Sequence, residues 1–592
     1  MSEAAAFDWK RLAVRAAGPT VILLAAALAM APQRMLGYSC GHDYDFHLLS
    51  WFESVNSWRH GLFYPHWAVS PNYGAGEPRF VFYPPLTWML GAALNLLMSW
   101  GYVSITVPYL LLAGTGLATR WLARELLADG PATLAGCAAV FSGYALFTAY
   151  ERSAFGELTG GMWIPLLLLF SLRDRKPDAG LQERALDGST LPLIAVVAGT
   201  WLSDVPLGVL ASYLLATAAL SAALLRRSWA PVLRATIGAV LGIGLSCFYL
   251  IPAAWEQKWV DVAQATNDPS SKIENSWLFA RHSDPALDLH DAVLLLVSII
   301  ASTMIAVALA GIAIAWRRGR LKGGRDWWII LGILPAAILF LQFPISHFVW
   351  NALPKLRFLQ FPWRWMVALE APMGIFLAAA IWPARRGMQF ALAIVCAMVF
   401  AGSTIIAREI FFQVCEPEDS ISAMAVVYLS GAGFDGTDEY EPPNADDSIV
   451  PTGLPGACLV EDPMKLLAKP TPDTNPAFDP AGHTCEATFA ARWAGAEHLE
   501  VSANVARAGY LVLKLRTYPA WQVKVNGRPA EQLDRREDGL MAVPIPAGPV
   551  SVDIHWGATP DVIASRWLSG ASLLLVTLVC LIERRLLRPQ LS

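Results

Sequence analysis

The chain has 592 residues, of which 55% are hydrophobic and only 16% are charged, and its mean hydropathy is +0.43. Soluble globular proteins carry about 25% charged residues, so this composition excludes an ordinary soluble enzyme and predicts a helical protein with many membrane spans. The net charge of −4 and the lack of a basic low-complexity block give no support for nucleic acid as a partner.

The first apolar run covers residues 19–32 and follows Lys10, Arg11 and Arg15. Positive residues stay on the cytoplasmic side of a span, so this run is expected to cross the membrane from a cytoplasmic N-terminus. The alternative is a cleaved signal peptide, because Ala29-Met30-Ala31 resembles a signal-peptidase site. The first-span interpretation is favoured, since many further spans follow and need no separate signal.

Twelve more apolar runs follow the first. They cover residues 86–99, 103–119, 131–149, 161–172, 189–203, 206–225, 230–250, 291–315, 327–343, 365–382, 388–405 and 566–583. If every run crossed the membrane, the cluster at Arg120 and Arg124 and every later basic cluster would lie outside. All of these clusters are cytoplasmic if the short run 86–99 does not cross and lies instead in the outer interface. The sequence therefore predicts about twelve spans with both termini in the cytoplasm. The segments expected outside are 33–102, 150–160, 251–290, 344–364 and 406–563.

The longest outer segment, 406–563, is expected to form a soluble domain before a last span and a cytoplasmic tail in 564–592. Its first part, up to about residue 490, is rich in proline, glycine, aspartate and threonine and predicts irregular structure. From His498 onwards short strands alternate with turns such as Asn526-Gly527, a pattern that predicts a β-sandwich.

Four of the eight cysteines fall in segments expected outside the cytoplasm, where a disulfide persists. They are Cys40, Cys415, Cys458 and Cys485. The favoured pair is Cys458 with Cys485. The other four cysteines lie in apolar runs and are expected to be small core residues.

The first outer loop opens with Asp43 and Asp45 among histidines and aromatic residues. Carboxylates beside a membrane boundary are costly to keep there, so they are functional candidates. One of the two aspartates is expected to act as a general base, with His42 and His47 contacting the substrate; Asp43 and His47 share a helix face. The acid pair with its histidines can also hold Mg²⁺ or Mn²⁺. The alternative is helix capping or a surface ion pair.

Two later motifs on the same face carry arginines. The sequence YERSAFGE contains Arg152, expected to bind phosphate, and Glu157, expected to contact sugar hydroxyls; the alternative is an internal pair that orders a turn. The sequence LRFLQFPWRW contains Arg357 and Arg364, which suit a lipid phosphate because a guanidinium binds phosphate bidentately. The alternative there is interfacial snorkelling. Asp204, before Val205-Pro206, is expected to cap the helix that follows, and the alternative is substrate binding.

Motifs of several reaction classes are absent: the sequence contains no Walker A loop, no G-x-S-x-G and no H-E-x-x-H. No nucleotide cofactor is therefore expected. The motifs that are present are, in chain order, GHD, YPHW, FYPPL, YERSAFGEL, FYLIPA and LQFPWRW, followed by YPAWQVKVNGRPAE, VPIPAGPVSVDIHW and SRWLSGASLL. Together they resemble the bacterial 6-pyruvoyl-tetrahydropterin synthase-related, YfhO-like membrane proteins of the GT-C glycosyltransferase superfamily. Nothing in the sequence points to pterin chemistry.

The resemblance implies a GT-C-like transmembrane domain over residues 1–405 and a catalytic acid in the first outer loop. That position matches Asp43, with Asp45 as the alternative. Such an enzyme moves a sugar, with inversion, from a polyprenyl-phosphate donor to an envelope lipid, glycan or protein at the outer face of the bacterial cytoplasmic membrane. The alternatives are a lipid-linked glycan transporter or flippase, and a non-catalytic envelope-assembly protein.

Overall fold

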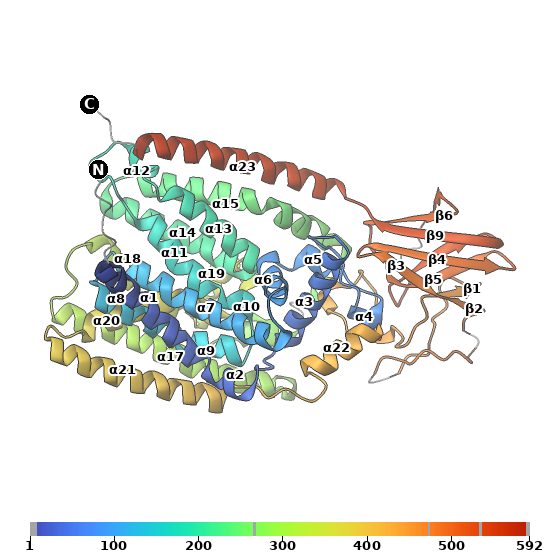
Figure 1. Cartoon of the computed structure of the whole chain (residues 1–592), viewed down its shortest axis with the longest axis horizontal. Helices are drawn as coiled ribbons and strands as arrows, with labels where there is room; N and C mark the ends of the chain where they lie inside the picture. Colours follow the sequence, from blue (N-terminus) through green and yellow to red (C-terminus); the bar gives the residue numbers. More distant parts are fainter. Residues whose placement is uncertain (1–8, 265–267, 472–473, 483, 532–535, 588–592) are drawn as a thin grey trace, which may run out of the picture.

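The computed structural model describes residues 9–264, 268–471, 474–482, 484–531 and 536–587. It is a bundle of roughly parallel helices with two β-sheets beyond one end of the bundle (Figure 1). The sheets come from the chain just before the last helix. The two ends of the chain, which the sequence places in the cytoplasm, lie outside the described residues.

Each of the twelve runs predicted to span the membrane forms a helix or a bent pair of helices. The helices are α1 (Trp9–Ala29), α7 (Trp100–Ala123), α8 (Asp129–Val140) with α9 (Gly143–Tyr150), α11 (Gly160–Leu172), α13 (Thr190–Ser203), α14 (Val205–Arg226), α15 (Ala230–Trp255), α17 (Asp288–Arg317), α18 (Arg325–Leu341), α20 (Glu370–Ile381), α21 (Arg386–Ile406) and α23 (Pro560–Leu587).

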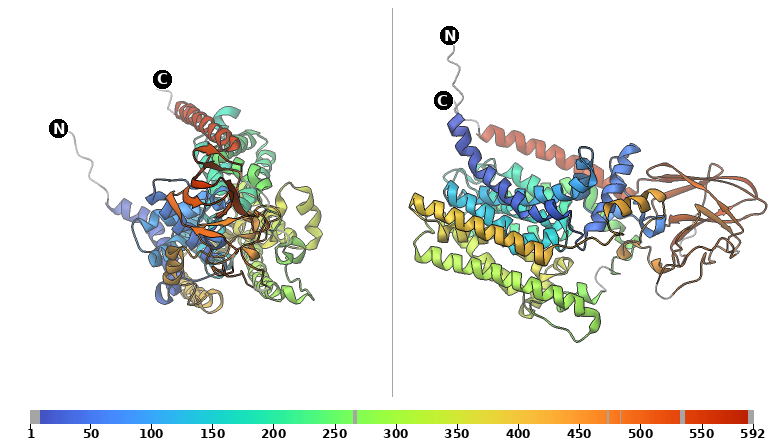
Figure 2. Two further views of the ribbon diagram at one scale, coloured as in Figure 1. Left: turned by 90° about the vertical axis from the view of Figure 1, so that its right-hand side faces the viewer. Right: turned by 60° about the horizontal axis from the view of Figure 1, so that its bottom comes forward.

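Seven helices among the described residues are long and apolar enough to cross a membrane, and up to ten if each of three bent pairs counts as one span. Three further apolar helices among the described residues are shorter, at Ala16–Ala29 within α1, at Thr190–Ser203, which is α13, and at Ile421–Ser430. The predicted number of about twelve spans therefore stays a prediction. Figure 2 shows α21 and α23 at the periphery of the bundle.

Short helices occupy the end of the bundle that faces the sheets. They include α2 (Ala31–Leu36), α3 (Tyr44–Arg59), α4 (Pro71–Gly74), α5 (Arg79–Phe82), α6 (Pro85–Asn95), α10 (Phe155–Leu158) and α22 (Ile421–Ser430). The run 86–99 forms α6, which begins after Pro84 and ends after only 11 residues. A helix of that length is too short to span a membrane, as the sequence analysis predicts.

The basic clusters meet at the opposite end of the bundle, where loops far apart in the sequence contact one another. Arg173 pairs with Glu125, and Arg226 pairs with Asp326. The Lys176 ammonium donates to the carbonyl of residue 586 over 2.7 Å. These contacts bring four separate loops and the end of α23 to one face, as the positive-inside rule predicts.

The remaining α-helices of the described residues are short. They are α12 (Leu181–Ala185) and α19 (His347–Ala352).

Two antiparallel sheets form the C-terminal β-region. One has the order β2-β1-β5-β8 and the other β3-β4-β9-β6-β7. The strands are β1 (Ala457–Val460), β2 (Ala487–Phe489), β3 (Ala491–Gly495), β4 (His498–Val505), β5 (Gly509–Arg516), β6 (Trp521–Val525), β7 (Arg528–Pro529), β8 (Leu540–Ile545) and β9 (Gly548–Trp556). Side chains of both sheets share one apolar core, since alternate residues of β4 point inward toward β5 and β8.

The strands predicted after His498 are present, whereas the stretch before residue 490 is less irregular than predicted. It contributes β1, which lies between β2 and β5 and is buried along its whole length. A strand buried on both faces shows no alternation, and a run of four apolar residues is too short to be recognised.

The predicted disulfide Cys458–Cys485 is confirmed, and Cys40–Cys415 forms a second one. The second disulfide ties the start of the first outer loop to the chain that follows α21. The four remaining cysteines are free and lie in apolar helices, but only Cys137 is buried as predicted, and Cys247, Cys396 and Cys580 are partly exposed. Both disulfides belong to the end of the molecule that carries the sheets.

Candidate active site

The first outer loop is held against the turn between α9 and α10 by its backbone. The Gly41 amide donates to the Ser153 hydroxyl over 3.2 Å, and the Asp43 amide donates to the Arg152 carbonyl over 2.8 Å. A side chain at Gly41 would place its Cβ 2.6 Å from the Glu151 carbonyl oxygen, so only glycine allows this approach. Ser153 has a φ of +48°, a conformation that costs about 1–3 kcal/mol in a residue with a side chain. The loop and the turn are therefore fixed together.

A chain of alternating charges crosses this junction. Asp43 Oδ2 lies 3.6 Å from Arg152 Nη2, and Arg152 Nη1 lies 2.6 Å from Glu157 Oε2. The same Glu157 oxygen lies 3.2 Å from Arg364 Nε, and the Tyr144 hydroxyl donates to the other oxygen. The Arg152, Glu157 and Arg364 side chains are 15%, 7% and 13% exposed. Three segments separated by more than 100 residues thus meet in one largely buried ion cluster.

Asp43 is the accessible end of the cluster. Its side chain is 32% exposed, and its Oδ1 lies 2.7 Å from Nδ1 of the exposed His42. Burial alone would raise the pKa of Asp43, but the hydrogen bond from His42 and the charge of Arg152 more than offset it and lower this pKa to about 2. The hydrogen bond to Asp43 in turn raises the pKa of His42. Asp43 is therefore ionised at any physiological pH.

Asp45 differs from Asp43 in its surroundings. It is exposed in the first turn of α3, and its Oδ1 accepts a hydrogen bond from the Phe46 amide over 2.7 Å. Asp43 occupies the N-cap position of α3 but makes no side-chain capping bond. The Asp45 side chain thus bonds only to the backbone at the start of its own helix in the contacts described, whereas the Asp43 side chain joins the ion cluster. The structure therefore distinguishes Asp43, the favoured candidate, from Asp45, which the sequence leaves open as the alternative.

His47 supports the site from within the protein. Its ring is buried, with Nε2 accepting from the Phe155 amide over 3.2 Å and Nδ1 lying 3.2 Å from the Tyr83 hydroxyl. Burial lowers the pKa of His47 to about 4, so the ring is neutral. Both ring nitrogens contact protein groups. His47 fixes the start of α10, the helix that carries Glu157.

Asp204 adds a carboxylate for which the sequence favours helix capping over substrate binding. The cap is confirmed, because Asp204 Oδ2 accepts from the Leu207 amide over 2.8 Å at the start of α14. The same side chain faces Gly156, where an added Cβ would lie 3.6 Å from Asp204 Oδ1. Burial raises the pKa of Asp204 to about 6 although the nearby Arg364 charge opposes this shift. The spacing of these residues along the sequence does not predict that Asp204 lies close to Gly156 and Arg364.

The two arginines of the LRFLQFPWRW motif have different environments. Arg364, on the 3₁₀ helix η7 (Pro362–Ala368), also donates to the Leu359 carbonyl over 3.1 Å and lies 5.1 Å from the centre of the Phe361 ring. Arg357, on η6 (Leu356–Leu359), is half exposed and pairs with Glu274 and with Asn351 Oδ1 at 2.8 Å. Arg364 therefore belongs to the ion cluster, while Arg357 contacts a separate set of residues.

The residues here do not fit a resident Mg²⁺ or Mn²⁺ ion. Asp43 faces a guanidinium, and Asp45 accepts a hydrogen bond from its own helix, so the pair offers no convergent oxygen ligands. Two groups elsewhere in the described residues bring three potential ligand atoms within 4.8 Å of one another. They are His498, Glu500 and Asp553, and Asp438, Glu441 and Asp447.

No family model and no curated protein matches this chain. Several solved structures are similar to it. The Archaeoglobus fulgidus oligosaccharyltransferase complex with Zn and sulfate has 14% identity and a TM-score of 0.38, over 71% of this chain and 58% of that one. Archaeal AglB from the same organism, in complex with an inhibitory peptide and a dolichol-phosphate, has 11% identity and a TM-score of 0.40, over 74% and 61%.

ArnT from Cupriavidus metallidurans bound to undecaprenyl phosphate has 15% identity and a TM-score of 0.29, over 73% of this chain and 90% of that one. The chain spans about three fifths of the length of the archaeal enzymes. At these TM-scores the similarities establish no function for this chain, and its membership of the YfhO-like family stays a prediction.

Proposed function

We propose that this protein is a membrane glycosyltransferase. It moves a sugar from a polyprenyl-phosphate donor to a hydroxyl group of an envelope lipid, glycan or protein. The observation that carries the proposal is the ion cluster, in which the accessible carboxylate of Asp43 is connected through Arg152 and Glu157 to Arg364. Sugar transfer from a lipid phosphate needs a carboxylate to receive a proton and cations to stabilise the departing phosphate.

In the proposed reaction the acceptor hydroxyl attacks the anomeric carbon while Asp43 takes its proton. The new carbon–oxygen bond forms as the bond from the anomeric carbon to the phosphate oxygen breaks, and that oxygen leaves with the electron pair. A single displacement inverts the sugar carbon. Because the pKa of Asp43 is about 2, Asp43 is a weak base, and proton transfer follows the departure of the phosphate rather than preceding it.

The arginines stabilise the departing charge. Arg364 and Arg152 present guanidinium groups on two sides of Glu157, which positions both. These ion pairs lie in a largely buried region, where electrostatic interactions exceed those in water. Glu157 is thus a positioning residue in this proposal rather than a contact for sugar hydroxyls, and Arg357 receives no part in the reaction.

The site faces the outside of the bacterial cytoplasmic membrane in this proposal. The basic clusters gather at the end of the bundle remote from the sheets, which the positive-inside rule assigns to the cytoplasm. The ion cluster adjoins Cys40, whose disulfide to Cys415 requires an oxidising compartment. Both observations support the same orientation, with both termini in the cytoplasm.

The test compares Asp43→Asn with its matched control Asp45→Asn, each as the full chain purified in detergent. The assay measures cleavage of a radiolabelled synthetic polyprenyl-phosphate sugar in the presence of bacterial envelope extract. Asp43→Asn is expected to lower turnover by about 10²–10⁴-fold, and Asp45→Asn by less than about twofold. Near-normal turnover in both variants contradicts the base assignment. With the chain reconstituted into liposomes, translocation of the intact labelled lipid without cleavage would instead establish the transporter alternative.

A further inference from the structure

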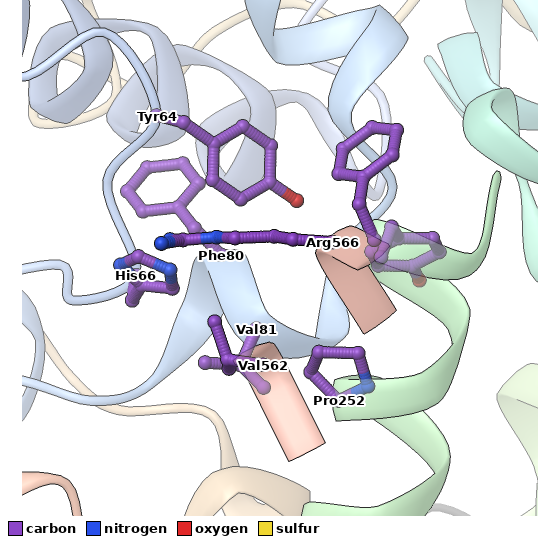
Figure 3. A pocket seen from close by; sticks show the side chains of 9 residues that line it. Tyr64, His66, Phe80, Val81, Pro252, Val562 and Arg566 are labelled. Carbon is purple, nitrogen blue, oxygen red and sulfur yellow. The ribbon is translucent and has the colours of Figure 1, made fainter. Parts of the chain in front are cut away.

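A cavity of about 300 Å³ lies beside the start of α23, where the first outer loop, α5 and α15 meet (Figure 3). Its walls include Tyr64, His66, Phe80 and Tyr249, and Arg566 of α23 reaches into it. In the view of Figure 3 the Arg566 side chain crosses the cavity with its guanidinium end toward His66 and Phe80. The cavity therefore combines aromatic walls with one cation.

Some polar groups that line this cavity have hydrogen-bond partners in the protein, and others have none among the described residues. His66 Nδ1 lies 3.3 Å from Glu497 Oε1, and the Tyr249 hydroxyl donates to the Phe82 carbonyl over 2.6 Å. Within the described ranges of the chain, by contrast, neither the Arg566 guanidinium nor the Tyr64 hydroxyl makes a hydrogen bond or an ion pair. Arg566 is exposed and Tyr64 is partly buried. A cation and a hydroxyl donor thus face the same space, and an anionic ligand there would accept hydrogen bonds from both.

The surroundings of Arg566 point to a lipid rather than a soluble anion. α23 lies alongside α15 at the edge of the bundle (Figure 1). Its exposed apolar side chains include Trp567, Leu568, Leu574 and Leu578. Arg566 lies near the start of α23, at the end next to the sheets, which is the depth of lipid headgroups for a spanning helix. A headgroup in the cavity would leave its alkyl chain along this apolar face.

We propose that this cavity binds the phosphate headgroup of an anionic lipid, with Arg566 and Tyr64 as donors. A guanidinium binds phosphate through two parallel hydrogen bonds. The segment 79–83 separates this cavity from the candidate active site, because Tyr249 bonds to Phe82 on one side and the Tyr83 hydroxyl contacts His47 on the other. The inference does not depend on the proposed glycosyltransferase activity.

The experiment titrates the full chain, purified in detergent, with dioctanoyl phosphatidic acid and measures Kd by isothermal titration calorimetry. Arg566→Gln is expected to raise Kd at least about tenfold, and Tyr64→Phe by about threefold. The matched control is Arg408→Gln, because Arg408 is a half-exposed arginine at the end of another peripheral helix, and among the described residues its side chain pairs only with its neighbour Glu409. This control is expected to change Kd by less than about twofold.

Two further probes distinguish the source of the phosphate. Dioctanoylglycerol carries the chains without the phosphate, and inorganic phosphate carries the charge without the chains. Neither is expected to displace the phosphatidic acid at equal concentration. Displacement by inorganic phosphate would show that the cavity binds a soluble anion rather than a lipid. Binding of dioctanoylglycerol with the same Kd would show an apolar groove with no phosphate site. Either result would overturn the proposal. An unchanged Kd in Arg566→Gln would also overturn the proposal.

Discussion

The pH dependence of sugar transfer separates Asp43 from Asp204 as the base. Both carboxylates lie close to the arginines of the ion cluster, but their pKa values differ by about four units. The pKa of Asp43 is lowered to about 2, whereas burial raises the pKa of Asp204 to about 6. Between pH 8 and pH 4 Asp43 stays ionised, while the ionised fraction of Asp204 falls from nearly complete to about 1%.

With Asp43 as the base, kcat/KM is expected to change by less than about threefold over this range, since kcat/KM reports the free enzyme. With Asp204 as the base, kcat/KM would fall about 100-fold, by a factor approaching ten for each unit below pH 6. The assay is cleavage of the labelled polyprenyl-phosphate sugar by the detergent-purified chain. A 100-fold loss that disappears in Asp204→Asn would refute the assignment to Asp43.

Asp204→Asn is a suitable variant because asparagine caps a helix as well as aspartate does. It removes the charge of Asp204 and keeps the hydrogen bond to the Leu207 amide. A group whose pKa is raised by folding contributes stability below its unfolded pKa and loses it as the pH rises through its folded pKa, so acidification from pH 8 to pH 4 stabilises the fold through Asp204. His47 acts in the opposite direction, because its pKa is lowered to about 4 and the fold loses stability as the pH falls below the ordinary histidine value of about 6.5. Tm in detergent is therefore recorded at each pH, and the test uses the range in which Tm stays constant.

Three further predictions concern the remaining cluster and the disulfide. Arg364→Gln should raise the KM for the lipid-phosphate donor at least about tenfold and Arg357→Gln less than about twofold, because only Arg364 joins the cluster; equal effects would contradict this division. Glu157→Gln leaves two guanidiniums without their shared carboxylate, at a cost of about 3–5 kcal/mol, and should lower Tm in detergent; an unchanged Tm would refute the buried pairing. Cys40→Ser should also lower Tm, as a disulfide contributes about 2–4 kcal/mol, and dithiothreitol should lower the Tm of the wild-type chain by more than that of this variant, which keeps the Cys458–Cys485 disulfide; an equal drop in both would contradict the prediction.

The helices and most strands follow from local sequence patterns. Apolar runs with basic ends give the bundle helices, and alternation gives β4 and its neighbours. The Pro84-Pro85 start of the run 86–99 similarly predicts a short separate helix, and α6 is one. The sequence does not predict β1, because its four residues are all buried and show no alternation of apolar and polar side chains.

The candidate site is predicted only in part, because it is made by tertiary contacts. The sequence places Asp43, Arg152 and Arg364 on one face by parity, and the structure joins them in one cluster. It gives no means of choosing Arg364 over Arg357, since both lie in one aromatic motif. It also favours capping over substrate binding for Asp204, because the approach of α14 to residue 156 depends on how two helices pack and is not visible in the sequence.

The most direct measurement is a cryo-electron-microscopy structure of the full chain with a bound synthetic polyprenyl phosphate. The account predicts density for the phosphate beside Arg152 and Arg364, with the Asp43 carboxylate facing the same space. A phosphate held instead by Arg357, or only in the cavity of Arg566 while the Asp43 side stays free of lipid, would contradict the proposed sugar transfer.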